Sequence, residues 1–178
     1  MLALHVDDSL FGIKDEAEEK RIRDLMMNEY KAEMEDEHFF CGIRIEHDRK
    51  TKRMFLSQEA YIDQMIEKFD MIDARIIRTP MDDRETLTKE MEPTTEEEKE
   101  KMKELPYASL VGAIMWPATM TRPDILAAYQ TLTKFNKNPG IKHWNAALRV
   151  LKYLKGTKRF GMLIDGCGIT FSKDTDGK

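Results

Sequence analysis

Two adjacent carboxylates near the start of the chain are the residues best suited to chemistry. Asp7 and Asp8 separate two short apolar runs, residues 2–6 and 9–13. This pattern predicts a β-hairpin with the acidic pair at or beside its turn. Two carboxylates held there could bridge two Mg²⁺ ions roughly 3.5–4 Å apart. Asp is also an ordinary turn residue, because its side chain accepts hydrogen bonds from nearby backbone amides, so the residues alone leave both interpretations open.

The elements that would position this pair come next in the sequence. Asp15 predicts the start of a helix, with Glu18 as its capping-box partner. Apolar residues at helical spacing give this helix one face, made of Ile22, Leu25, Met26 and Tyr30. A second hairpin is predicted from the alternation between Phe39 and Ile45, which Met54 and Leu56 continue after a polar turn.

The remaining elements are mostly helical. Ser57 predicts the cap of a helix with an apolar face at Ile62, Met65, Ile66 and Phe69. Residues 82–104 are dominated by charge, which predicts a mobile linker with a solvated helical tail after Thr94 or Thr95. Three helical stretches should follow, and a last hairpin should turn near Asp165-Gly166.

Proline and glycine suggest where these three helices begin and end. The first should run from about Tyr107 to Trp116 and stop at Pro117. The second should open at residues 121–124, with proline in its first turn and Asp124 as the box partner. The third should run from about Trp144 to Lys155, with an apolar face at Ala147, Val150, Leu151 and Leu154, and end at Gly156.

Composition limits the classes of protein to which the chain could belong. Of its 178 residues, 41% are hydrophobic and 35% charged, which allows a core but is a high charge content. No apolar run approaches the roughly 20 residues of a membrane span, and no signal peptide is evident. The distant Cys41 and Cys167 have no ligand spacing, which favours reduced residues of an intracellular protein.

Charge is divided unevenly along the chain. Residues 1–104 hold 29 acidic and 18 basic side chains, whereas residues 105–178 hold 4 acidic and 11 basic ones. The basic second part could lie along a phosphate backbone. The two parts could equally attract each other, and composition does not decide between these interpretations.

Seven segments in a fixed order resemble one family of proteins. The sequence His5-Val6-Asp7-Asp8 is similar to the Tyr-X-Asp-Asp box of reverse transcriptases, and the rest of the chain resembles copia-type retrotransposon polymerases. The matching segments are Phe40-Cys-Gly-Ile-Arg-Ile45, Leu56-Ser-Gln-Glu-Ala-Tyr61, Thr79-Pro-Met81, Tyr107-Ala-Ser-Leu-Val-Gly112, Thr121-Arg-Pro-Asp-Ile125, His143-Trp144 and Tyr153-Leu-Lys-Gly-Thr157. Each is weak alone, but together they form a strong signal.

The resemblance implies roles for the first part of the chain. Asp7 and Asp8 match the palm aspartates that bind the catalytic Mg²⁺ ions, while His5 departs from the family's tyrosine, which puts the activity of even an intact parent in doubt. The hairpin that positions the primer end, the primer grip, matches Phe40, Cys41, Gly42 and Ile43. An ordinary two-faced hairpin is the alternative for that stretch.

The resemblance also implies a contact with nucleic acid in the second part. Gly112 and Trp116 match the thumb helix that lies in the minor groove of a template–primer duplex, since glycine lets a backbone approach closely. A helix–helix contact that buries both residues is the alternative. A basic edge at Arg149, Lys152 and Lys155, continued by Lys158 and Arg159, suits phosphate contacts, although a solvated helix face is the commoner explanation.

These observations together predict an α+β chain. Residues 1–81 are expected to form a palm remnant of two hairpins and a helix, 82–104 a charged linker, 105–137 thumb-like helices, and 138–178 a connection, with a terminal hairpin, toward a ribonuclease H domain that the sequence lacks.

The expected function is that of a fragment of an RNA-directed DNA polymerase. It should be inactive alone, because the resemblance implies a third carboxylate and fingers that this sequence does not contain. A non-catalytic duplex-binding module and a purely structural remnant are the alternatives. The expected partners are an RNA·DNA or DNA duplex and the missing half of a polymerase or a second copy, with no membrane. The expected location is the cytoplasm, in a virus-like particle for the parent element, or the nucleus.

Overall fold

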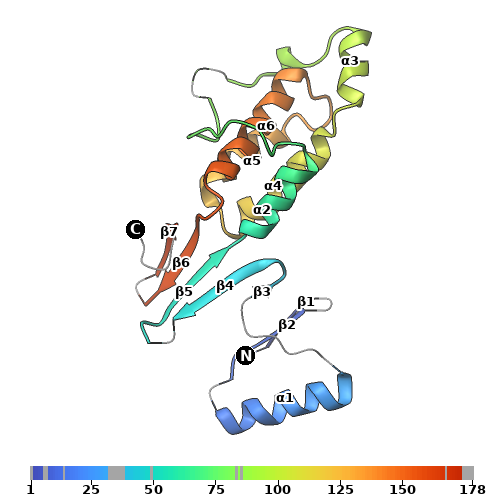
Figure 1. The fold of residues 1–178 in the computed structure, drawn as a ribbon. Helices are drawn as coiled ribbons and strands as arrows, with labels where there is room; N and C mark the ends of the chain where they lie inside the picture. Colours follow the sequence, from blue (N-terminus) through green and yellow to red (C-terminus); the bar gives the residue numbers. More distant parts are fainter. Residues whose placement is uncertain are drawn as a thin grey trace.

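An antiparallel sheet and a bundle of helices make up most of the chain (Figure 1). The computed structural model describes residues 2–5, 8–13, 15–31, 39–48, 50–82, 84, 86–166 and 168–173. Within them the sheet has five strands in the order β3 (Phe39–Phe40), β4 (Ile43–Asp48), β5 (Arg53–Ser57), β6 (Gly161–Asp165) and β7 (Gly168–Ser172). The predicted mixture of helices and antiparallel strands is confirmed.

In the sequence, the helical bundle lies between β5 and β6, two strands that are neighbours in the sheet. Strand β5 leads directly into the bundle, and β6 follows it, with Ser57 pairing with Gly161. Gly161 is required there, because a Cβ would lie 2.1 Å from the carbonyl oxygen of Leu56. The bundle consists of α2 (Glu59–Lys68), α4 (Tyr107–Met120), the 3₁₀ turn η2 (Pro123–Ile125), α5 (Leu126–Thr133) and α6 (Ile141–Gly156).

One hydrophobic core joins segments from both sides of the predicted linker. The expected face of α2 is buried, and it packs with α4, α5 and α6. Fully buried members include Ile62, Leu110, Ile114, Ile125, Leu132, Val150 and Leu154. The division of the chain into palm, thumb and connection stays a prediction, but residues from all three predicted parts share this core.

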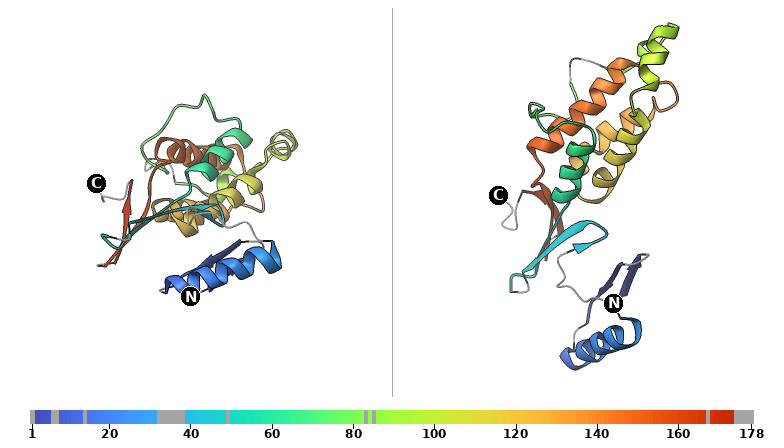
Figure 2. Two further views of the ribbon diagram at one scale, coloured as in Figure 1. Left: turned by 60° about the horizontal axis from the view of Figure 1, so that its bottom comes forward. Right: turned by 45° about the vertical axis from the view of Figure 1, so that its right-hand side comes forward.

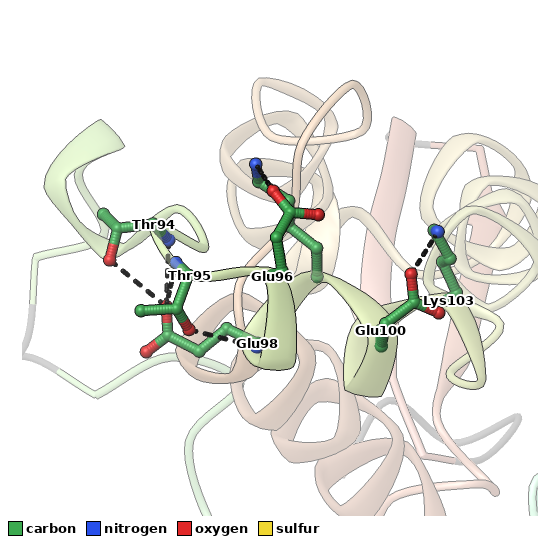
Figure 3. A network of polar contacts seen from close by, with 7 residues as sticks. Thr94, Thr95, Glu96, Glu98, Glu100 and Lys103 are labelled. Carbon is green, nitrogen blue, oxygen red and sulfur yellow. Dashed lines mark hydrogen bonds and ion pairs between the residues drawn. The ribbon is translucent and has the colours of Figure 1, made fainter.

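The charged segment makes ordered contacts with the bundle. It contains the 3₁₀ turn η1 (Lys89–Met91) and α3 (Glu96–Lys103). Helix α3 begins after Thr95, as predicted, and Thr95 and Glu98 form a capping box there (Figure 3). Asn138 Nδ2 donates to Glu92 Oε2 at 2.9 Å, and Met102 is buried. Glutamate–lysine pairs line the exposed side of α3.

The first part of the chain lies beyond β3 and β4, on the side away from the bundle (Figures 1 and 2). Strands β1 (Leu2–His5) and β2 (Asp8–Phe11) form a separate antiparallel pair. Helix α1 (Glu16–Tyr30) follows, and the Asp15 carboxylate accepts from the Ala17 and Glu18 amides, which confirms the predicted cap. The Glu18 carboxylate accepts from Arg21 instead of closing a capping box, and no α1 side chain is buried.

Two predicted helix starts and one predicted capping partner were wrong, whereas the proline expected in the first turn of the second helix is confirmed at Pro123 of η2. Helix α2 is preceded by Gln58, since Ser57 ends β5. Asp124 closes no capping box and instead accepts hydrogen bonds from Arg122. Helix α6 begins at Ile141 rather than near Trp144, because the imidazole of His143, in its first turn, accepts a hydrogen bond from the amide of Gly140.

Candidate nucleic-acid interface

The acidic hairpin is formed as expected in its described part. His5 pairs with Asp8 across the two strands, so a two-residue connection joins them and Asp8 begins β2. Asp7 lies outside the described residues, and so does the side chain of Asp8. Among the residues that the structure describes, no three His, Cys, Asp or Glu side chains form a group that could hold a metal ion. Mg²⁺ binding by Asp7 and Asp8 therefore stays a prediction.

The segment that resembles the primer grip is a tight turn rather than a continuous strand. Phe40 pairs with Ile43, and the residues between them, Cys41 and Gly42, have φ angles of 52° and 73°. Two successive positive φ angles are those of a type I′ hairpin turn. The alternation read from the sequence missed this turn, because Cys41 is not a residue that usually adopts positive φ.

A pocket of about 220 Å³ lies between this turn and the start of α2. Phe39, Gly42 and Arg44 line it from the hairpin, and Gln58, Glu59 and Asp63 line it from the helix. The two carboxylates are paired with Lys158, whose Nζ lies 2.9 Å from Asp63 Oδ2 and 3.4 Å from Glu59 Oε1. The hydrogen bond to Asp63, together with this ion pairing, raises the pKa of Lys158, so its ammonium group is charged at neutral pH.

Helix α4 presents its glycine to open space. A Cβ added to Gly112 would meet no heavy atom within 4 Å, and the residue is exposed. Trp116 lies one turn further on the same face and is half-buried, with exposed Met115 beside it. The alternative that Gly112 allows a close helix–helix contact is therefore excluded among the described residues, and the face is free for an external partner.

Helix α4 continues through Pro117 to Met120, whereas the sequence predicted a stop at the proline. Proline has no amide hydrogen, so the carbonyl of Ala113, four residues earlier, loses its usual helical donor. The hydroxyl of Tyr61 donates to that carbonyl at 3.1 Å. A side chain from α2 thus replaces the missing bond, which explains how the helix passes the proline.

Two members of the predicted basic edge make contacts within the chain. Lys155 Nζ donates to the carbonyls of Met71 and Ala74 at 3.3 and 2.8 Å and also to that of Ile72. Arg149 Nη2 donates to Thr79 Oγ1 at 2.9 Å. Their role in duplex binding stays a prediction, but a phosphate contact by either would compete with these bonds.

A buried arginine was missed in the sequence as a structural centre. Arg122 is 0% exposed and donates to both carboxylate oxygens of Asp124 at 3.0 and 2.8 Å, and to the carbonyl of Thr157 at 2.9 Å. The hydroxyl of Tyr153 donates to Asp124 at 2.7 Å, and burial together with this carboxylate raises the pKa of Tyr153. One signal was available: Asp124 is one of only four acidic residues after position 104.

The side chain of His143 connects the charged segment, residues 82–104, to α6. Its Nδ1 accepts from the Gly140 amide at 2.9 Å, and its Nε2 lies 3.1 Å from the carbonyl oxygen of Thr88. The ring is fully buried and stacks on Phe135 at 3.9 Å between centroids. Nδ1 must be unprotonated to accept, so Nε2 carries the proton. Burial lowers the pKa of His143.

Comparison with known proteins gives relatives of one kind over most of the chain. It is 37% identical over 158 residues to the retrovirus-related Pol polyprotein from transposon TNT 1-94 of Nicotiana tabacum, and 31% identical over 169 residues to that from transposon RE2 of Arabidopsis thaliana. These matches cover 88% and 92% of this chain but only 12% and 11% of the two polyproteins.

A shorter match has a different name. A stretch of 61 residues, 34% of this chain, is 48% identical to secreted RxLR effector protein 161 of Plasmopara viticola and covers 43% of that protein. No family model matches the chain, and no solved structure matches it. None of the helices in the described part of the chain has the length and apolar character that a membrane span requires. The two long matches show that the chain is similar, over about nine tenths of its length, to one segment of the Pol polyproteins of copia-type retrotransposons.

Proposed function

We propose that this chain is part of an RNA-directed DNA polymerase and that its helical half holds a template–primer duplex. In this proposal Asp7 and Asp8 bind Mg²⁺, whose preferred ligands are oxygens of this kind. The metal would supply the activation of the primer hydroxyl and the neutralisation of phosphate charge. The chain alone does not extend a primer, because two neighbouring carboxylates do not complete a two-metal site.

The exposed face of α4 is the observation that carries the proposal. Gly112 leaves the helix backbone uncovered, and Trp116 offers an apolar ring one turn away. A helix can approach the sugars of a shallow groove closely only where no side chain intervenes, and an aromatic ring beside the gap packs on those sugars. The exposed backbone at Gly112 and the nearby ring of Trp116 thus support a duplex of RNA·DNA or DNA as the partner.

A binding measurement with two tryptophan variants tests this proposal. Trp116→Leu should weaken the binding of a fluorescent RNA·DNA duplex about tenfold or more, while Trp144→Leu, at a half-buried tryptophan of α6, should leave it unchanged. Circular dichroism confirms that both variants are folded. Equal affinity for wild type and Trp116→Leu would reject the α4 face as the duplex site.

Primer extension tests the catalytic part separately. With Mg²⁺ and all four nucleotides, the chain should bind the duplex without incorporating a nucleotide. Incorporation that Asp7→Asn abolishes would overturn the proposed inactivity. Duplex binding that is steeply weakened by salt, without incorporation, is the behaviour expected of a non-catalytic binding module. No binding even at low salt would leave a structural remnant.

A further inference from the structure

Residues 71–79 are an irregular segment laid along α6 by side chains of that helix. Lys155 donates hydrogen bonds to three backbone carbonyls at the start of the segment, and Arg149 donates a hydrogen bond to the hydroxyl of Thr79 at its end. Between these points Ile76 lies against Gly156, where a Cβ would come within 3.2 Å of the Ile76 Cβ. The segment is therefore held against α6 at both of its ends.

This position leaves a set of cations on the surface. Arg75 and Arg78 are exposed, and Lys152 lies on α6 between the two tethering residues. None of the three makes a hydrogen bond or ion pair with a described residue. The nearby Asp82 carboxylate is already shared with Arg149, at 3.4 Å, so Asp73 is the one remaining acid of the segment.

Some other basic residues of the helical half are paired with acids within the chain, although Lys134 and Lys137 make no ion pair with a described residue either. Lys158 is paired with Asp63, Arg122 with Asp124, and even the exposed Arg159 lies 3.8 Å from Glu59. Residues 71–79 together with Lys152 therefore form a surface with three cations that no described acid neutralises, which leaves their positive charge for an external anion. We call it the loop–α6 basic surface.

We propose that the loop–α6 basic surface binds the phosphate backbone of a nucleic acid, at a site separate from the α4 face. The inference rests on the proposed function and names the residues of a second contact. A guanidinium presents paired N–H donors that match two phosphate oxygens. Arg75 and Arg78 are at most about 10 Å apart along the chain, so one strand can engage both.

Exposed apolar side chains alternate with these arginines. Ile72 and Ile76 are 59% and 58% exposed, and such side chains can contact sugars between phosphates. Lys155 and Arg149 are positioning residues in this scheme: they hold the loop and do not touch the ligand. This reassigns two residues that the sequence suggested as phosphate contacts.

Salt-dependent duplex binding of a double variant tests the proposal. Arg75→Gln/Arg78→Gln should bind a short RNA·DNA duplex about tenfold more weakly at low salt, and the slope of log affinity against log salt should fall by about 1.8, or 0.9 for each lost phosphate contact. Arg21→Gln/Arg23→Gln, in α1, removes the same charge and should change neither quantity.

A tether variant distinguishes positioning from general stability. Lys155→Met should weaken binding in the wild-type background and have no further effect in the Arg75→Gln/Arg78→Gln background, because its action passes through those arginines. An equal effect in both backgrounds would contradict the assigned positioning role.

The outcomes separate this proposal from the proposed function. Suppose that wild type binds the duplex, that Trp116→Leu weakens this binding, and that the double arginine variant does not weaken it. Only the proposal for the loop–α6 basic surface is then refuted. If wild type binds no duplex at low salt, both fail. Binding of poly-glutamate that the double arginine variant abolishes, with duplex binding unchanged, would assign the surface to an acidic protein and overturn the proposal.

Discussion

The variant Gly112→Ala tests separately how Gly112 affects the stability of the fold and how it affects the binding of a duplex. Gly112 lies in the interior of α4, where glycine costs roughly 0.5–1 kcal/mol relative to alanine. An added Cβ meets no heavy atom within 4 Å, so no steric term opposes this gain. The variant should therefore be more stable than wild type by roughly 0.5–1 kcal/mol, which corresponds to a rise in melting temperature of roughly 1–4 °C for a chain of this length.

The same variant should bind a duplex less well. A methyl group at position 112 stands between the helix backbone and a groove that approaches it, so affinity should fall severalfold, and further for Gly112→Leu. Thermal denaturation by circular dichroism gives the first quantity, and fluorescence anisotropy with a labelled duplex gives the second. Gly140→Ala is the matched control for the first, since its Cβ would lie 1.9 Å from the Met91 carbonyl oxygen and should destabilise the fold.

Two results would refute the reasoning about Gly112. A lower melting temperature would mean that the glycine is needed for packing, contrary to the open space around it. A higher melting temperature with unchanged duplex affinity would mean that no partner approaches the backbone there. Only greater stability combined with weaker binding supports the proposed use of the α4 face.

Three further predictions concern the contacts that hold the bundle together. Tyr61→Phe should cost about 1 kcal/mol in urea denaturation, and less in a Pro117→Ala background, where the restored amide takes the place of the hydroxyl; an equal cost in both backgrounds would contradict this pairing. Arg122→Met should lower the free energy of unfolding by roughly 3–5 kcal/mol, because it leaves a carboxylate without its buried partner; a loss below about 1 kcal/mol would show that the partner is easily resolvated. The pKa of His143 is lowered in the folded state, so its contribution to stability is complete above about pH 6.5 and is lost as the pH falls below that value; His143→Asn should flatten the pH dependence of the melting temperature between pH 7 and 5, whereas His47→Asn, on exposed β4, should not.

Local patterns predicted most of the elements. The apolar spacing of Ile62, Met65 and Ile66 identified the buried face of α2, and Asp15 identified the cap of α1. The final hairpin also formed where the turn residues placed it. Each of these depends on residues within one or two turns of each other, which is the range that a sequence pattern can describe.

Contacts between distant residues account for what was missed. The continuation of α4 past Pro117 depends on Tyr61, on another helix. The early start of α6 depends on an imidazole that also contacts Thr88. Spacing alone identifies no such partners, because it describes neighbours on one element only.

The candidate nucleic-acid interface could also be predicted only in part from the spacing of residues in the sequence. Gly112 and Trp116 were identified by their order in the chain, and the empty space around Gly112 excludes a tight helix–helix contact there among the described residues, while their role in duplex binding stays a prediction. Lys155 resembled a phosphate ligand because its spacing placed it beside Lys152. In the structure its ammonium group donates to backbone carbonyls, which carry no residue-specific signal, so no sequence pattern could have revealed these contacts. Its role in duplex binding stays a prediction.

The pairing of β5 with β6 has a consequence for how the chain folds. Strands β4 and β5 are joined by a short turn and can pair early, whereas Ser57 meets Gly161 only after the whole intervening bundle has collapsed. Until then β5 has an open edge, which is a site for association with other chains. A shortened polypeptide that stops before Phe160 should therefore aggregate during refolding even though every buried residue of the hydrophobic cluster in the helical bundle is present.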